Sequence, residues 1–456
     1  RYNNWNNAAV KGACLLDGDS LLVCGNIGIW LTDTGFTFFT DYNAGFPGGI
    51  DNRKINKIHR TTGGRLLSAT LFGLYIHDPE GGEWVHQAIP AHDEQVVDIV
   101  EAAGTTYLMT RSFLYRMDKG RNGYEFHEIA LSPPAGYRSK VGLFKTLWVL
   151  HSGEIGGAAG KLFVDMLALA LAFLSLTGII YWLFPKWIKR RKRLQREIGS
   201  LRRINRFSLK WHNKVGVWMV AFLLITTITG MFLRPPLLIA IADAQVGKIP
   251  YTVLDDPNPW YDQLRRILYD ERYRGFIVGT NKGIYFADAG FEQELLPFDR
   301  QPPLSVMGIN VFEQTDQGHY LVGSFNGLYL WNPFHGWMID YFSPGNAVVV
   351  NPSGPPLSDN MTAGAIKVGK KNQYVFDYNR GVLRLAGSMP FPAMPEDVIE
   401  KSPMSLWNLA LEFHTARFYS FLFGNLYILF IPLFGLSMIV ILLTGFWLWL
   451  KKFRRK

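Results

Sequence analysis

The chain has 456 residues, of which 48% are apolar and 14% are aromatic, and it carries a formal net charge of +10. This apolar content exceeds that of an average soluble protein, so part of the chain is expected to contact lipid. The net positive charge comes from two short segments, 186–214 with +11 and 451–456 with +5, and the rest of the chain sums to −6. That concentration argues against an extended phosphate-binding surface and therefore against nucleic acid as a partner.

Residues 1–146 are predicted to form the first half of a β domain, about three blades of a propeller. Short runs of alternating β-branched and aromatic residues, bounded by glycine, aspartate and asparagine, are typical of antiparallel strands. Cys14 and Cys24 flank a predicted hairpin turn in this half. A cross-strand disulfide between them stays open, because strand register alone decides whether the two thiols meet.

The next segments, 147–185 and 215–234, are each expected to hold one transmembrane helix. Their apolar cores reach the roughly 20 residues that a bilayer requires. Asp165 is the one charged residue in the apolar part of the first helix, and it fits either a proton relay or a paired structural carboxylate. The basic segment 186–214 between them is expected to be a cytoplasmic loop, because positively charged loops stay inside.

The second half of the β domain is predicted over 235–405, followed by a third transmembrane helix over 406–450. This helix is long for one span, so either Pro432 kinks it or its first turns lie outside the lipid. The tail 451–456 holds five cations and is also expected in the cytoplasm. Both β halves then lie on the opposite side, which predicts a multi-pass protein of the bacterial inner membrane with a large periplasmic domain.

The two β halves contain an internal duplication. "GIWLTDTGF" at 28–36 returns as "GIYFADAGF" at 283–291, and "INKIHRTTGGRLLSATLFGLYI" at 55–76 returns without a gap as "INVFEQTDQGHYLVGSFNGLYL" at 309–330. Units at the spacing of propeller blades, three from each half, predict one closed six-bladed β-propeller. Two separate small β-sandwiches are the alternative, although they would leave exposed edge strands.

The duplication extends into the membrane segments. His151 follows "LW" and precedes a helix ending "LTG", and His414 has the same setting in the second copy. The helix over 215–234 precedes the second β half and has no counterpart before the first. We therefore expect a further helix before Arg1, which gives four transmembrane helices in the complete protein.

Three histidines at helix ends are candidate haem ligands. Placing an imidazole in lipid is unfavourable in free energy unless the ring is paired or bound to a metal. Haem iron can bind one imidazole on each face of the haem. His151 and His414 would hold an outer haem, and His212 would hold an inner haem with a histidine from the expected additional helix. A plain interfacial role is the alternative for each histidine taken alone.

Other metal chemistry fits less well. No CxxCH motif for covalent haem and no zinc-type cysteine cluster occurs in the sequence. Glu154 and Glu412 lie near the histidines and are equally explained as solvated charges. Arg417 could contact either a haem propionate or a lipid phosphate.

These segments resemble the PepSY-associated transmembrane family, which includes di-haem b ferric-siderophore reductases of the inner membrane. The resemblance rests on the "LH-x-G" and "WH-x-x-x-G" elements around His151 and His212 and on the repeated "TG" helix ends. It implies that His151, His414 and His212 ligate haem. The predicted propeller departs from the small α/β modules of better-known members.

The leading functional hypothesis is a transmembrane haem b oxidoreductase. It would pass electrons from a cytoplasmic or quinol donor to a periplasmic acceptor, most plausibly ferric iron in a siderophore or other chelate. No GxGxxG fingerprint follows a strand, so a bound dinucleotide is not expected. The alternative is a membrane-anchored propeller that binds or scaffolds a periplasmic or transporter partner without redox activity.

Overall fold

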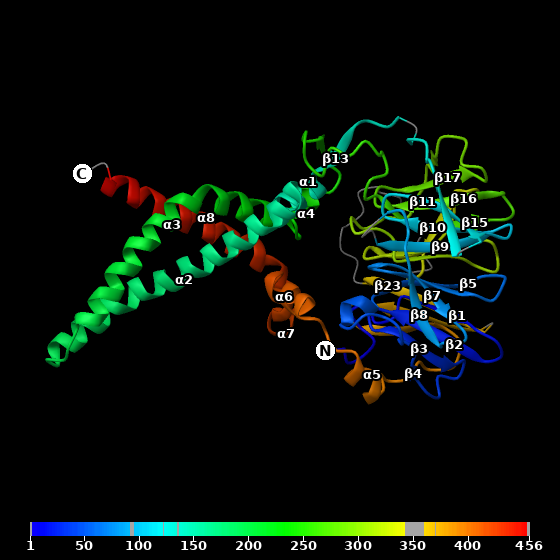
Figure 1. Cartoon of the computed structure of the whole chain (residues 1–456), viewed down its shortest axis with the longest axis horizontal. Coiled ribbons are helices and arrows are strands. Elements are labelled where there is room, and N and C mark those ends of the chain that lie inside the picture. Colours follow the sequence, from blue (N-terminus) through cyan, green and yellow to red (C-terminus); the bar gives the residue numbers. More distant parts are fainter. Residues whose placement is uncertain are drawn as a thin grey trace. The chain divides into compact units, whose positions relative to one another are not determined.

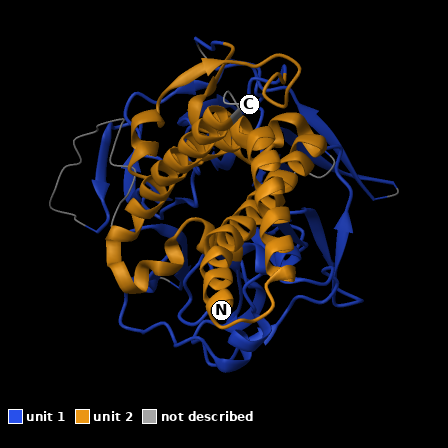
Figure 2. Cartoon of the chain, turned by 90° about the vertical axis from the view of Figure 1, so that its left-hand side faces the viewer, with its two compact units in different colours: residues 1–138, 257–409 blue, residues 139–256, 410–456 orange. Residues whose placement is uncertain are grey.

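The computed structural model describes residues 2–91, 95–121, 123–134, 136–342, 360–369 and 371–453. The chain divides into two compact units, and each unit combines two separate stretches of sequence (Figure 2). The β unit comprises Arg1–Arg138 and Pro257–Leu409, and the helical unit comprises Ser139–Asp256 and Ala410–Lys456. The last cations of the basic tail, 454–456, lie outside the described residues.

The β unit consists of antiparallel sheets whose strands are consecutive in sequence (Figure 1). The first copy contributes β1 (Gly12–Leu15), β2 (Ser20–Gly25), β3 (Gly28–Asp33) and β4 (Thr40–Asp41); β5 (Ile55–Arg60), β6 (Leu66–Thr70), β7 (Gly73–Asp78) and β8 (Glu83–Gln87); and β9 (Val96–Ala102), β10 (Thr105–Thr110), β11 (Leu114–Gly120) and β12 (Gly123–Ile129). The second copy contributes β15 (Leu264–Asp270), β16 (Gly275–Thr280), β17 (Ile284–Asp288) and β18 (Leu296–Pro297); β19 (Val311–Gln314), β20 (Tyr320–Ser324), β21 (Gly327–Asn332) and β22 (Trp337–Asp340); and β23 (Thr362–Val368), β24 (Asn372–Asp377) and β25 (Gly381–Ala386). The predicted all-β domain is therefore confirmed.

Each sheet packs against the next sheet along the chain through its first strand. β5 packs against β1, β9 against β5, β15 against β9, β19 against β15, and β23 against β19. β23 also packs against β1. Neighbouring sheets share apolar clusters; the one joining the first and last sheets includes Trp5, Trp30 and Tyr374.

The two sequence repeats have the same local geometry. Leu67 pairs with Ile76 in the first copy, and Leu321 pairs with Leu330 in the second. The turn glycines of these hairpins, Gly73 and Gly327, have φ of 114° and 119°, which a glycine adopts without steric cost. The two repeated sequence segments therefore form hairpins with the same strand register.

The strand register separates the two cysteines. Cys14 pairs with Leu22, and Cys24 pairs with Gly12. Both thiols are free, and burial raises the pKa of Cys24 to about 12. Cys14 and Cys24 therefore do not form the disulfide that the sequence allowed, because they do not lie opposite each other across the hairpin.

The remaining elements are mostly helical. The β unit also holds η1 (Ile50–Arg53) and α5 (Glu396–Lys401), and α6 (Leu406–His414) spans the boundary between the units. The helical unit contains β13 (Lys140–Gly142) paired with β14 (Gln245–Gly247), α1 (Leu143–Ser152), η2 (Glu154–Gly156), α2 (Gly157–Arg193), α3 (Gly199–Met231), α4 (Leu237–Ile241), η3 (Arg417–Tyr419), α7 (Ser420–Phe423), η4 (Gly424–Leu429) and α8 (Phe430–Phe453). Three segments are long and apolar enough to cross a membrane: Glu154–Arg193, Gly199–Met231 and Arg417–Lys452.

The helix ends differ from the sequence-based boundaries. The basic segment 186–214 is mostly helix, because α2 continues to Arg193 and α3 begins at Gly199. α8 begins at Phe430, so Pro432 lies in its first turn and produces no kink in its middle. A proline is tolerated there because the first N–H groups of a helix have no partner within it.

Close packing in the helical unit depends on glycine. A Cβ on Gly435 of α8 would lie 2.3 Å from Cγ of Met231 in α3. Gly216 of α3 faces Leu174 of α2, where a Cβ would make an ordinary contact at 3.7 Å. Small residues let apolar helices approach closely, which is the usual way in which membrane helices associate.

Candidate functional site

His151 lies on the short helix α1 and not on the long helix α2 that follows it. Gly153 ends α1 with a φ of 76°, and the chain turns through η2 before α2 begins. A Cβ on Gly160 would lie 2.0 Å from the carbonyl oxygen of Gly153, so two glycines are needed where the chain reverses. His151 therefore precedes the spanning helix α2 and is separated from it by this turn.

His151 is held against α3. Its Nδ1 lies 2.9 Å from the carbonyl oxygen of Thr226 and 3.4 Å from Oγ1 of Thr229. A carbonyl oxygen only accepts, so Nδ1 carries the hydrogen and donates it. The lone pair of Nε2 is then available to bind a metal.

Burial, and to a lesser extent the neighbouring His414, lower the pKa of His151. The Thr226 carbonyl acts in the opposite direction without cancelling these effects. The imidazole is therefore held in its neutral form, which is the form that binds metals.

His414 lies close to His151 although the two are far apart in sequence. It ends α6, and Ala416 with a φ of 59° breaks the chain direction directly afterwards. The two imidazole rings have centroids 5.8 Å apart and planes inclined by 42°. The structure thus brings together the two histidines that the duplication paired.

The histidine spacing is compatible with an axial ligand pair. Two metal–imidazole bonds of about 2 Å each, plus the distance from each nitrogen to its ring centre, place the centroids roughly 6 Å apart. The observed 5.8 Å is close to that value. Within the described ranges no group of three or more His, Cys, Asp or Glu could hold a metal ion, but a haem needs only two axial ligands.

His212 of α3 occupies a second site, against α2. Its Nδ1 lies 2.9 Å from Oγ1 of Thr177, and that hydroxyl donates its own hydrogen to the Phe173 carbonyl at 2.7 Å. The hydroxyl can then only accept from His212, so Nδ1 again carries the hydrogen. One turn earlier, Ser208 donates to the Thr177 carbonyl at 2.8 Å, which fastens α3 to α2 at this point.

The two histidine sites lie at different levels of α3. His212 is just before the middle of the helix, and Gly230, which adjoins His151, is its penultimate residue. They are about five turns apart, so the sites are separated by about 27 Å along the helix. This is close to the ~30 Å thickness of a bilayer core.

The other residues singled out from the sequence have plainer surroundings. Arg417 forms an ion pair with Glu412, with Nε 3.1 Å from Oε2. Glu154 begins η2 in the turn that follows His151, and Asp165 is exposed on α2. The sequence reading missed Thr177, Thr229 and Gly230, although the repeated "TG" was the signal that could have found them.

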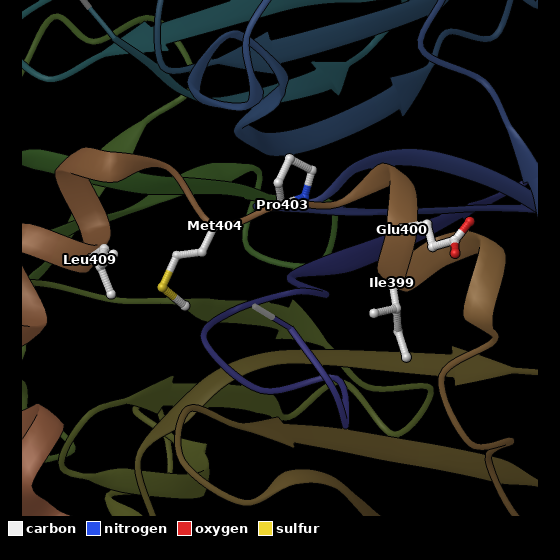
Figure 3. A pocket seen from close by; sticks show the side chains of 5 residues that line it. All are labelled: Ile399, Glu400, Pro403, Met404 and Leu409. Atoms are coloured by element: carbon white, nitrogen blue, oxygen red, sulfur yellow. The ribbon is translucent and has the colours of Figure 1, made fainter.

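Two shallow pockets occur away from the histidines. One, of about 390 Å³, belongs to the β unit and is lined by Ile399, Glu400, Pro403, Met404 and Leu409 (Figure 3). The other, of about 460 Å³, lies along the basic start of α3 and is lined by Gly199, Arg202, Arg203, Arg206, Phe207 and Lys210. Neither contains a histidine, a cysteine or a pair of carboxylates, so neither provides an alternative catalytic group.

The sequence pattern of the PepSY-associated TM region matches residues 82–452. The chain belongs to this family. The match includes the three apolar segments and the histidines His151, His212 and His414, so the family resemblance noted from the sequence is confirmed. Membership in this family, together with those segments, identifies a membrane protein.

Solved structures similar to this member of the PepSY-associated TM family are distant. The extracellular domain of a one-component system from B. thetaiotaomicron is 10% identical, with a TM-score of 0.40, and the match covers 82% of this chain and 32% of that chain. PorZ, a surface component of the type-IX secretion system of Porphyromonas gingivalis, is 10% identical with a TM-score of 0.37, and the match covers 82% of this chain and 38% of that chain. A protein described as a gluconolactonase is 7% identical with a TM-score of 0.34, and the match covers 85% of this chain and 91% of that chain. The chain thus spans about a third of the first two proteins, and no curated protein matches it.

Proposed function

We propose that this protein is a membrane-bound haem b oxidoreductase that passes electrons across the bilayer to an acceptor on the outer side. The observation that carries the proposal is the pair formed by His151 and His414, whose ring centroids are 5.8 Å apart. Two imidazoles at this spacing would provide the two nitrogen ligands that a haem iron can accept. Haem, when bound, would supply one-electron redox chemistry.

The chain's own residues would orient the outer haem. His151 and His414 would hold its iron, and the hydrogen bond from Nδ1 of His151 to the Thr226 carbonyl would leave Nε2 available for the metal. Arg417 lies three residues after His414 and already holds the carboxylate of Glu412. The same guanidinium could hold a haem propionate.

The inner haem would be bound by His212. Its second axial ligand would be a histidine of a further transmembrane helix, as the duplication predicts. The separation of about 27 Å along α3 between the two sites would place one haem near each face of the membrane. Electrons could then cross in two steps, from a cytoplasmic or quinol donor to the outer face.

The orientation follows from charge. The cations that end α2 and begin α3, together with those that end α8, favour the cytoplasmic side of a bacterial inner membrane. The β unit would then lie in the periplasm. There it would provide the surface on which an acceptor or a protein partner docks.

The β unit is proposed to be a six-bladed propeller. Five four-stranded sheets and one three-stranded sheet occur among the described residues, and the contact of β23 with β1 returns the series to its start. The repeated hairpins β6–β7 and β20–β21 would then belong to opposite blades. Two separate sandwiches are less well supported, because β9 of the first copy packs against β15 of the second.

A ferric chelate, such as an iron-loaded siderophore, is the proposed acceptor. Siderophores bind Fe(III) through hard oxygen ligands, and reduction to the softer Fe(II) weakens that binding and releases the metal. No catalytic side chain is required for this chemistry beyond the haem ligands. A docking surface and a haem near the outer face would be sufficient.

Spectroscopy of the purified full-length protein tests this function. The wild-type protein should be red, with the Soret and α bands of a six-coordinate haem, and should reduce a ferric chelate added from the outside. His151→Ala and His414→Ala should each remove about half of the haem, and His212→Ala should remove the other half. His127→Ala changes a histidine on β12 paired with Asp118 and serves as the control.

Two outcomes would reject the oxidoreductase. A folded, colourless wild-type protein would favour a binding or scaffolding role for the β unit. Full haem content with an unchanged spectrum in the His151→Ala, His414→Ala double variant would reject these ligands.

A further inference from the structure

A Thr-Gly pair contacts each of the two buried histidines. Thr177–Gly178 of α2 meets His212, and Thr229–Gly230 of α3 meets His151. The two pairs lie on different helices, and their contacts are about five turns apart along α3. The repetition therefore does not come from a single packing contact.

The threonine of each pair is arranged to accept a hydrogen. Thr177 donates to the carbonyl of Phe173 at 2.7 Å, and Thr229 donates to the carbonyl of Ile225 at 2.8 Å. Each hydroxyl hydrogen is therefore used within its own helix. The remaining lone pairs face the Nδ1 atoms of the histidines, at 2.9 Å for His212 and 3.4 Å for His151.

The glycine of each pair makes room for the ring. A Cβ on Gly230 would lie 2.6 Å from Cε1 and 3.0 Å from Nδ1 of His151, so no side chain fits there. A Cβ on Gly178 would lie 3.5 Å from Cε1 of His212, which is an ordinary contact. The ring of His151 is thus pressed against the backbone of α3 more tightly than the ring of His212 is against α2.

We propose that the Thr-Gly pairs are positioning residues that fix the tautomer and the ring plane of the two histidines. By holding hydrogen on Nδ1, each pair leaves Nε2 as the metal-binding nitrogen. By admitting the ring to the helix surface, the glycine sets the plane in which the imidazole meets the iron. The inference rests on the proposed haem function and specifies how that function is tuned.

A third Thr-Gly pair on α8 has the same internal arrangement. Thr444 donates to the carbonyl of Val440, four residues earlier, at 2.6 Å. No atom of the described residues lies within 4 Å of a Cβ placed on Gly445. By the duplication, this pair corresponds to Thr177–Gly178.

The geometry predicts opposite sensitivities at the two sites. At the His212 site Oγ1 of Thr177 lies 2.9 Å from Nδ1, and the backbone of Leu174 also bonds to the ring, so Thr177→Val should reduce retention of the inner haem about 10-fold, while Gly178→Ala should be mild. At the His151 site the Thr226 carbonyl also accepts from Nδ1, so Thr229→Val should be mild. Gly230→Ala should displace the ring and reduce retention of the outer haem by a similar factor.

The test measures haem content, the low-spin electron paramagnetic resonance signal and the midpoint potential of each haem in the full-length protein. The resonance signal depends on the planes of the axial rings, so a merely structural threonine would not shift it. Thr177→Ser should restore the wild-type values. Thr227→Val and Ser175→Ala are matched controls, because these hydroxyls bond only to carbonyls of their own helices, Leu223 and Leu171.

Each outcome decides the inference. Selective changes in Thr177→Val and Gly230→Ala, with unchanged controls, would support it. A red wild-type protein whose Thr177→Val and Gly230→Ala variants match the controls would overturn the inference and leave the oxidoreductase intact. A colourless wild-type protein would overturn both.

Discussion

Lys11 shows how strongly the β unit can perturb a single side chain. Its Nζ donates to Oδ1 of Asn56 at 3.0 Å, on the neighbouring sheet. Burial, followed by the charge of Arg266, lowers its pKa from 10.5 to about 7. Arg266 itself joins three sheets, because its guanidinium donates to the carbonyls of Val97 and Asn310 at 2.8 and 2.9 Å. A few long cations thus connect the first strands of the sheets.

The depressed pKa of Lys11 predicts a pH-dependent stability. In the unfolded chain Lys11 titrates near its ordinary value, so between about pH 7 and pH 10 the unfolded state binds more protons than the folded state. The free energy of unfolding should therefore rise with pH across this window. Lys11→Met should flatten that rise and stabilise the protein most below pH 7, as measured by thermal unfolding monitored by tryptophan fluorescence at pH 6, 8 and 9.5. Lys119→Met, at an exposed site on β11, is the control, and identical pH profiles for wild type and Lys11→Met would contradict the prediction.

Among the elements, the turn between α1 and α2 matters most for the site. The sequence predicts one transmembrane helix over 147–185, whereas the structure divides this segment into α1, η2 and α2. The reversal depends on a backbone contact between Gly153 and Gly160, which hydropathy does not report. The same limit explains why the Thr-Gly pairs went unnoticed, since their roles lie in hydrogen bonds between helices.

Other features could be read from the sequence because they depend on periodicity or composition. The three apolar segments follow from their length, and the β strands from alternation and turn residues. The meeting of His151 with His414 could be anticipated because a duplication places equivalent residues in equivalent positions. The register of β1 with β2 could not be predicted from the sequence, because a shift in strand pairing would change which residues oppose Cys14 and Cys24.

Gly160→Ala should displace α1 and weaken the His151–His414 site. A methyl group there would lie 2.0 Å from the Gly153 carbonyl oxygen, a distance that requires the backbone to move. We expect loss of the outer haem with little change at His212, measured by haem content and by the two midpoint potentials. Gly156→Ala is the matched control, because a Cβ at Gly156 meets nothing within 4 Å. Equal haem content in both variants would show that the turn does not position His151.

At the scale of the whole molecule, both units are assembled from chain segments separated in sequence. The β unit is interrupted between Arg138 and Pro257, and the interruption contains α2 and α3. The family match spans this interruption, since it runs from 82 to 452. The histidine sites and the sheets therefore belong to one interleaved chain and not to domains joined end to end.

The proposed orientation predicts opposite accessibility for two exposed serines. Ser200, near the start of α3, should be cytoplasmic, and Ser388, in the β unit after β25, should be periplasmic. Cysteines placed at these positions, in a background lacking Cys14 and Cys24, should react differently with a membrane-impermeant maleimide in intact cells: Ser388→Cys should be labelled and Ser200→Cys should not. Labelling of both would contradict the orientation.

The contact between the first and last sheets imposes an order on synthesis. Trp5 donates its indole N–H to the Pro392 carbonyl at 2.9 Å, and Asn7 donates its backbone N–H to the Tyr378 carbonyl at 2.8 Å. At about 5–20 residues per second, the ribosome adds these partners roughly 20–70 s after the residues they complete. During that interval α2 and α3 are synthesised, while the apolar cluster that buries Trp5 and Trp30 is still incomplete. Trp5 therefore reaches its final environment only after Pro392 has been synthesised.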